Sequence, residues 1–131
     1  MAAFTLPQRA FGAYCAVVSF MILIFPELFS TVITTLTLGF VSLEDIRPDL
    51  LASHYGSVCG FFYGYIGFWY IANAKSEEFS RFSVTGRCVG VPIGFALLVV
   101  LGKVPWKLMV FVVMDVVFAL WTQASFPQKK A

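Results

Sequence analysis

The sequence predicts an all-α fold, a four-helix transmembrane bundle, and three observations support this prediction. Hydrophobic residues make up 60% of the 131 residues and only 12% are charged, whereas soluble domains carry roughly 25% charged residues. The mean hydropathy is +0.86. Four apolar stretches are each about as long as the roughly 20 residues that span a bilayer as a helix. They cover about 10–29, 51–74, 82–101 and 104–126, and we expect them to form one integral membrane domain over residues 1–131.

The first predicted span runs from about Ala10 to Phe29 and follows one basic residue, Arg9. This start resembles a secretory signal peptide. The apolar run nevertheless continues without a small-residue cleavage site until Pro26 and Glu27 interrupt it. We therefore expect an uncleaved first membrane helix.

A 21-residue connection, residues 30–50, joins the first and second predicted spans. Its first part has helical amphipathic spacing, with the threonines Thr31, Thr34 and Thr35 on one face and Val32, Ile33, Leu36 and Phe40 on the other. This pattern predicts a short interfacial or re-entrant helix. Because the segment is rich in β-branched residues, a β-hairpin arm is the alternative. Residues 42–49 are polar and net acidic, so we expect them in water or against a partner.

Two glycine ladders occupy the second and third predicted spans, which the polar loop 75–81 joins into a hairpin. The first contains Gly56, Gly60, Gly64 and Gly67, and the second contains Gly86, Gly90 and Gly94. Small residues let helix backbones approach closely in lipid. In the hairpin, Gly60, Gly64 and Gly67 lie level with Gly94, Gly90 and Gly86, so we expect the ladders to pack together.

Two alternatives to this packing remain open. Membrane helices carry more glycine than soluble ones in any case. The glycine groove is also suited to aromatic rings from the first span or from another subunit.

The fourth predicted span follows the turn at Gly102 and Lys103, and Pro105 suits the first turn of a helix. Four spans place both termini on one side of the membrane. That side is the more basic one, since Arg9, Lys75, Arg81, Lys129 and Lys130 fall there with Arg87 just inside, against Arg47, Lys103 and Lys107 opposite. The positive-inside rule then places the termini in the cytoplasm or mitochondrial matrix, and we favour the mitochondrial inner membrane.

Asp115 is the strongest candidate for a functional polar residue inside the membrane. A carboxylate at the centre of a membrane helix costs roughly 2.5 to 3.5 kcal/mol on insertion, so it needs a partner or a purpose. It can be protonated and neutral, or it can accept hydrogen bonds from Ser19, Tyr63 or Tyr65. A third account pairs Asp115 with Arg87. That pairing is strained, because the two residues lie at different depths and their side chains lean apart.

Arg87 has alternatives to this ion pair. Its long side chain can snorkel to the interface, or its guanidinium can stack on Tyr14, Trp69 or Tyr70. Glu27 and His54 form a second possible pair near the opposite interface, for proton transfer or headgroup binding. The simpler interpretation is that both are interfacial residues in contact with water.

The sequence contains no catalytic motif. It has no zinc-protease, nucleophile-elbow or phosphate-loop pattern. Three scattered cysteines, Cys15, Cys59 and Cys88, resemble apolar fillers and give no metal spacing. We therefore expect no catalytic residue, metal or cofactor. The net charge of +2 gives no basic patch for nucleic acid.

The layout of the chain resembles that of small DoxX-like four-helix membrane proteins. The stretch that resembles them runs from His54 to Phe126, and its matching residues are Gly56, Gly60, Gly64, Arg81, Gly90, Gly94 and Asp115. The resemblance implies a bundle with a glycine-rich second helix and a loop that ends in arginine. Members of that group are linked to quinone-coupled oxidoreductase complexes.

These features predict a structural accessory subunit of a larger membrane complex, in a respiratory chain or another electron-transport or energy-converting assembly. Its partners would be other membrane subunits and phospholipid, with cardiolipin as a candidate. The residues expected at the lipid headgroups are Lys75, Arg81, Trp69, Tyr70 and Trp121. The alternative is a small membrane enzyme or carrier that binds a lipid or quinone in the bundle. Asp115 would then act as acid or base, assisted by Tyr63 or Tyr65.

Overall fold

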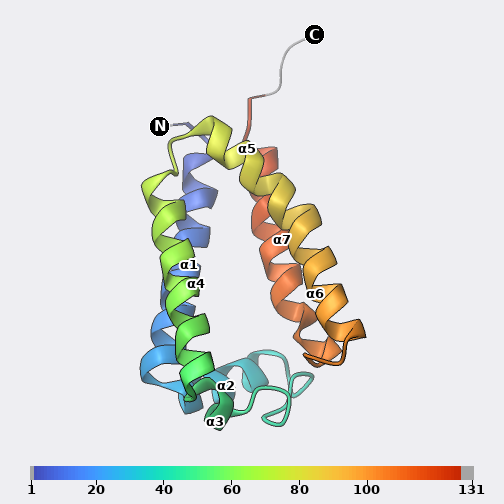
Figure 1. The fold of residues 1–131 in the computed structure, drawn as a ribbon. Coiled ribbons are helices and arrows are strands. Elements are labelled where there is room, and N and C mark those ends of the chain that lie inside the picture. Colours follow the sequence, from blue (N-terminus) through green and yellow to red (C-terminus); the bar gives the residue numbers. More distant parts are fainter. Residues whose placement is uncertain (1, 128–131) are drawn as a thin grey trace. The chain divides into compact units, whose positions relative to one another are not determined.

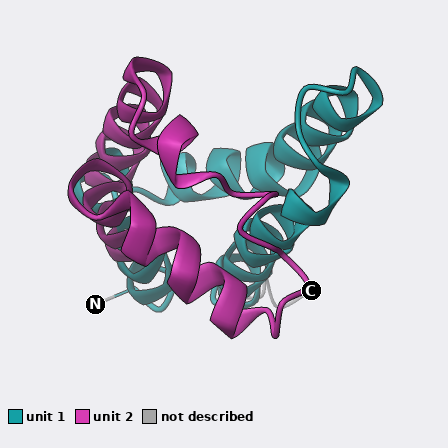
Figure 2. Ribbon diagram, turned by 90° about the horizontal axis from the view of Figure 1, so that it is seen from below, with its two compact units in different colours: residues 1–12, 69–131 teal, residues 13–68 magenta. Residues whose placement is uncertain are grey.

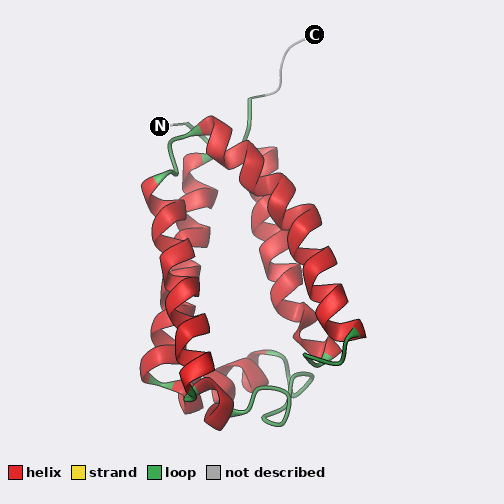
Figure 3. Ribbon diagram, viewed as in Figure 1, coloured by secondary structure: helices red, strands yellow, loops and turns green. Residues whose placement is uncertain are grey.

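The computed structural model describes residues 2–127, and within this range the protein consists of helices joined by turns and loops, with no strand (Figure 3). The all-α prediction is confirmed. The elements labelled in Figure 1, together with two short η segments, are α1 (Thr5–Ile24), α2 (Pro26–Leu36), α3 (Pro48–Leu51), α4 (His54–Ala72), α5 (Glu77–Thr85), the π-helical η1 (Gly86–Gly90), α6 (Val91–Val100), the 3₁₀-helical η2 (Trp106–Leu108) and α7 (Met109–Ala124).

Three helical segments are long and apolar enough to cross a membrane. They are α1, the continuous run Glu77–Val100 that contains α5, η1 and α6, and the run Trp106–Ala124 that contains η2 and α7. These match the first, third and fourth predicted spans. Helix α4 matches the second predicted span in position and carries no acidic or basic residue apart from His54. Its many glycines and tyrosines make α4 less hydrophobic than the other three segments. The assignment of α4 as the fourth membrane span therefore stays a prediction.

The chain divides into two compact units (Figure 2). Unit 1 comprises residues 1–12 and 69–131, and unit 2 comprises residues 13–68. Unit 1 therefore contains the first turns of α1, the end of α4 and all later helices. Unit 2 contains the rest of α1, helices α2 and α3, and most of α4.

The first helix ends earlier than the predicted boundary at Phe29. Phe25 has φ −133° and ψ 58°, which is outside the helical region, and Pro26 begins α2. A residue that precedes proline is disfavoured in the helical region, while proline itself suits a first helical position. The proline thus divides the apolar run into two helices. The predicted short helix in the connection is present as α2, and the β-hairpin alternative is wrong.

Helix α2 ends in a Schellman turn with an unusual residue at its centre. The Gly39 N–H donates to the Thr34 carbonyl at 2.8 Å, and the Leu38 N–H donates to the Thr35 carbonyl at 3.0 Å. The residue in the left-handed position is Leu38, with φ +51°. Glycine normally occupies this position, because a side chain there costs roughly 1–2 kcal/mol. Gly39, with φ +79°, follows it.

The third span contains a five-residue π turn, η1, in front of a proline. The Val91 N–H donates to the Gly86 carbonyl, which closes the wider turn. In a regular helix Pro92 would lack its N–H bond, and its ring would clash with the carbonyl of Cys88. The wider turn accommodates this proline. Such turns often occur at functional positions, and this one carries Arg87.

Helices α5, η1 and α6 pack along α7 in unit 1. Val112, Ala119 and Thr122 are buried along α7 and Phe126 just beyond its end, at spacings that place them on one face with the half-buried Asp115. Phe126 belongs to a small core with Phe4, Val84 and Cys88. The buried face of α7 therefore changes from apolar to polar and back along its length.

Candidate functional site

The strongest candidate site is a buried arginine with its neighbours in unit 1. We call it the Arg87 cluster, and its members are Gln8, Phe11, Tyr70, Ser83, Arg87 and Thr122. They come from α1, α4, α5, η1 and α7. Arg87 is only 3% exposed, and Gln8 and Thr122 are fully buried. A buried charge needs compensating contacts, and these residues surround the Arg87 guanidinium with polar and aromatic groups.

Three neutral oxygens surround one end of the guanidinium. Arg87 Nη2 donates to Gln8 Oε1 at 3.5 Å, to Ser83 Oγ at 3.4 Å and to Thr122 Oγ1 at 3.4 Å. Gln8 Nε2 in turn donates to Ser83 Oγ at 3.0 Å. The three arginine contacts are long, so each is weak on its own. Together they link α1, α5 and α7 through one side chain.

The two hydroxyl groups of the cluster are oriented by their own helices. Ser83 Oγ donates to the Ser80 carbonyl at 3.1 Å, and Thr122 Oγ1 donates to the Phe118 carbonyl at 2.9 Å. With each hydroxyl proton directed at a carbonyl, the oxygen lone pairs remain for the guanidinium. The helices therefore present acceptors to Arg87 without placing a second charge there.

Two aromatic rings complete the surroundings of the guanidinium. Its central carbon lies 4.3 Å from the Phe11 ring centroid and 5.0 Å from that of Tyr70. The two rings also meet edge to face, with centroids 4.7 Å apart. Desolvated cation–π contacts are worth about 2 kcal/mol. Tyr70, one of the three rings expected to stack on Arg87, does so, and Phe11 was not anticipated.

Arg87 and Asp115 occupy different levels of unit 1. The guanidinium reaches α7 at Thr122, about 10 Å along the axis from Asp115 at roughly 1.5 Å per residue. It leans toward the N-terminus of its own helix, as helical side chains do. The Asp115 Oδ1 atom is buried with no hydrogen-bond partner in the described part of the chain. Ser19, one of its expected partners, donates to Gly60 in unit 2.

The first glycine ladder packs against α1 in unit 2. A Cβ atom at Gly60 would lie 3.0 Å from Ile22 and 3.2 Å from Leu23, and one at Gly64 would lie 2.5 Å from Ser19 Oγ. A Cβ atom at Gly56 would instead collide with the backbone carbonyl of Leu51, which lies just before α4. The small side chain of Ser19 allows this close approach of α1 to Gly60 and Gly64.

The second glycine ladder behaves differently. Gly86, Gly90 and Gly94 are exposed, and in unit 1 no heavy atom lies within 4 Å of a Cβ built on any of them. Gly67, the last residue of the first ladder, is buried. Packing of the two ladders on each other stays a prediction.

The residues expected at the lipid headgroups are only partly available for this role. Lys75, Trp69 and Trp121 are exposed. Arg81 forms an ion pair with Glu77 at 2.8 Å and lies over the Phe126 ring at 4.3 Å, whereas Tyr70 is part of the Arg87 cluster. Lys129 and Lys130 lie outside the described residues.

Glu27 and His54 are both exposed, and within residues 2–127 the structure records no ion pair between them. This agrees with the simpler interpretation of two interfacial residues.

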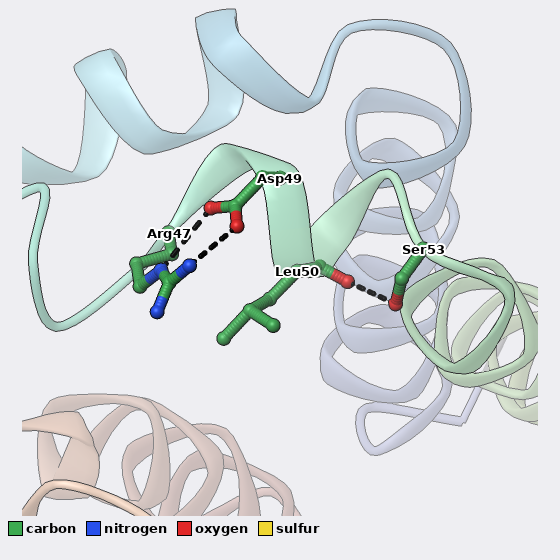
Figure 4. A network of polar contacts seen from close by, with 4 residues as sticks. All are labelled: Arg47, Asp49, Leu50 and Ser53. Carbon is green, nitrogen blue, oxygen red and sulfur yellow. Dashed lines mark hydrogen bonds and ion pairs between the residues drawn. The ribbon is translucent and has the colours of Figure 1, made fainter.

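The connection between α2 and α4 carries an exposed ion pair (Figure 4). Arg47 Nη2 donates to Asp49 Oδ2 at 2.6 Å, and Arg47 Nε donates to Asp49 Oδ1 at 3.2 Å. The hydrogen bond from Arg47 holds the pKa of the Asp49 carboxyl below its ordinary value, and the same bond raises the pKa of Arg47. As predicted, this acidic segment is accessible to water.

Groups of His, Cys, Asp and Glu that could hold a metal ion are absent from the described residues. The Arg87 cluster holds one cation among neutral oxygens. Such contacts can join neighbouring helices and keep the charge in one position. Four members of the cluster were not predicted from the sequence, namely Gln8, Phe11, Ser83 and Thr122. One signal was present, since Ser83 and Arg87 are four residues apart and share a helix face. No family model, curated protein or solved structure matches this chain.

Proposed function

We propose that this chain is a structural accessory subunit of a larger membrane protein complex, in a respiratory or other energy-converting assembly. The observation that carries the proposal is the exposed second ladder of Gly86, Gly90 and Gly94. A stripe without side chains on an apolar helix is the surface that another membrane helix approaches most closely. Unit 1 leaves this stripe open, so it is suited to a helix of a partner subunit.

Aromatic side chains on α4 give further support. Large rings project from several positions along this helix and are exposed, namely Tyr55, Phe61, Phe62, Phe68 and Trp69. Aromatic residues are enriched at the centres of protein interfaces, where they supply much of the binding energy. The exposed rings of α4 therefore make this helix, like the open glycine stripe of unit 1, suited to assembly with other subunits.

The membrane arrangement belongs to the same proposal. Helix α4 would be the fourth span of the bundle, which would bring both termini to one side. The basic residues Arg9, Lys75 and Arg81 would then face the cytoplasm or matrix, and the mitochondrial inner membrane is our favoured location. Lys75, with Trp69 and Trp121, would hold an anionic phospholipid such as cardiolipin. The DoxX-like layout is consistent with this role.

The experiment is isolation of the full chain from its native membrane in mild detergent, followed by native electrophoresis and mass spectrometry. We expect the chain to migrate with other membrane subunits in a stable assembly. Recovery as a single 14.5 kDa species, free of other proteins under conditions that preserve known complexes, would contradict the proposal.

One observation favours a second candidate, an enzyme or carrier for a lipid or quinone. Asp115 lies on the buried face of α7, and its Oδ1 has no hydrogen-bond partner among the described residues. A reactive or binding carboxyl would have such an environment. Under this second function, Asp115→Asn abolishes turnover or ligand binding and leaves assembly intact. Under the accessory-subunit function, the same variant leaves the activity of the parent complex unchanged.

A further inference from the structure

The segment that follows α2 exposes apolar side chains at a turn. Leu36 is 74% exposed, Leu38 is 95% exposed and Phe40 is 48% exposed. We call residues 36–41 the apolar tip. A water-facing turn of this kind usually carries glycine, asparagine or serine instead. The apolar tip therefore has the composition of a surface that is covered by something apolar.

The backbone N–H groups of the apolar tip all have hydrogen-bond partners. Six consecutive N–H groups, at residues 37–42, donate to α2 or to residues close in the chain. In order, the acceptors are the carbonyls of Ile33, Thr35, Thr34 and Thr37, then Thr37 Oγ1 and Asp45 Oδ2. An irregular segment in lipid needs its backbone N–H and C=O groups satisfied within the protein. The N–H groups of the apolar tip meet this requirement.

Three of the four nearby threonine hydroxyls, those of Thr31, Thr35 and Thr37, also donate back to their own helix. Thr31 donates to the Glu27 carbonyl at 2.9 Å, Thr35 to the Thr31 carbonyl at 2.8 Å and Thr37 to the Ile33 carbonyl at 2.8 Å. Thr31 and Thr35 are exposed, so water would be available to them if the helix faced solvent. Bonding to the preceding turn instead removes these donors from the surface.

Leu38 is both conformationally strained and exposed. It occupies the left-handed position of the Schellman turn, where glycine would be unstrained. Glycine occupies the next position, as Gly39, and not the left-handed position itself. Since Leu38 is almost fully exposed, the structure gives its side chain no packing role within the chain.

We propose that the apolar tip inserts into the hydrocarbon edge of the bilayer that α1 crosses. Only Phe25 separates α1 from α2, so the tip is tied to the end of this span by one helix of 11 residues, about 16 Å long. The adjoining residues Glu44 and Asp45 are acidic, and they disfavour an anionic surface. The lipid expected around the tip is therefore zwitterionic phospholipid.

The test uses the full chain, with its three cysteines replaced by alanine, in phosphatidylcholine vesicles. A single cysteine at Leu38→Cys or Phe40→Cys carries a polarity-sensitive fluorophore, and Glu44→Cys is the matched control in the same connection. We expect blue-shifted emission at positions 38 and 40, quenched by nitroxides on the acyl chains. The control should instead respond to aqueous iodide.

A second variant separates insertion from folding. Leu38→Gly relieves the left-handed strain and removes the exposed side chain. We expect its thermal unfolding temperature in detergent to rise, while acyl-chain quenching of the fluorophore at position 40 is lost. If the fluorophores at 38 and 40 are as accessible to iodide as that at 44, lipid insertion is wrong. If they become shielded only when partner proteins are present, a protein covers the tip and the proposal is also wrong.

These vesicles contain no other protein. Failure of the accessory-subunit proposal would therefore leave the result of this test unchanged.

Discussion

Ser19 donates a 2.7 Å hydrogen bond from its Oγ to the carbonyl oxygen of Gly60, which joins α1 to α4 in unit 2. The small serine and the glycines opposite it allow the two backbones to approach. A Cβ at Gly64, one turn further along α4, would already lie 2.5 Å from the same Oγ. The contact between the two helices thus depends on small residues on both sides.

Alanine at Gly64 should therefore destabilise the protein through Ser19. Overpacking of this kind costs about 1–3 kcal/mol. Ser19→Ala alone should cost about 1 kcal/mol, because it removes one buried hydrogen bond. We expect the double variant to be more stable than the sum of the two losses implies, since Ser19→Ala removes the nearest clashing atom. Thermal unfolding of all four proteins in detergent measures the coupling, and strict additivity would contradict it.

Replacement of Arg87 by methionine tests the Arg87 cluster. The side chain loses its hydrogen bonds and its contacts with Phe11 and Tyr70, so we expect a destabilisation of about 2 kcal/mol. The matched control is Arg81→Met on the same continuous helix, where the partly exposed contacts predict a loss below about 1 kcal/mol. Thermal unfolding in detergent compares the two. A gain in stability for Arg87→Met would show that desolvation of the charge outweighs its contacts.

Thr122 provides a finer test of the same site. Thr122→Val keeps the shape of the side chain but removes the oxygen that faces the guanidinium, and we expect a loss of about 1–3 kcal/mol. Thr122→Ser keeps the oxygen and should retain most of the stability. Equal losses in the valine and serine variants would indicate that the methyl group matters and the oxygen does not.

The Arg47–Asp49 ion pair should be broken by protonation of Asp49 only at acidic pH. The folded pKa of Asp49 is lowered, so the pair stabilises the connection at pH values above the ordinary pKa of aspartate, about 3.9. That contribution is lost as the pH falls through the lower folded pKa. In Arg47→Gln, the pKa of Asp49 should return toward its ordinary value. Carboxyl-carbon NMR titration measures it, and an identical pKa in both proteins would contradict the assignment.

Composition and run length were sufficient to predict the helical class and three helices long and apolar enough to cross a membrane, because a bilayer permits few backbone structures. The exact helix boundaries depended on single prolines. The sequence contains Pro26, but it did not reveal whether this proline would begin a helix or lie in a loop. Pro92 was overlooked, and with it the π turn that carries Arg87.

The partners of polar residues were harder to predict than the helices. Both the depth of Arg87 and the lean of its side chain argued against a direct pair with Asp115, and the guanidinium does reach Thr122 instead. Gln8 was not anticipated, since it sits before the predicted start of the first span. The glycine pattern indicated close packing correctly for Gly60 and Gly64, but periodicity alone does not reveal which helix supplies the neighbour.

The most direct test of the accessory-subunit account compares Gly90→Leu with Val89→Leu in the native membrane. Both positions are exposed on the same helix, but only Gly90 lies on the open ladder. After mild-detergent isolation, quantitative mass spectrometry counts the proteins that accompany each variant. The account predicts that Gly90→Leu folds normally and loses its partners, while Val89→Leu keeps them. Equal recovery of partners with both variants would contradict it.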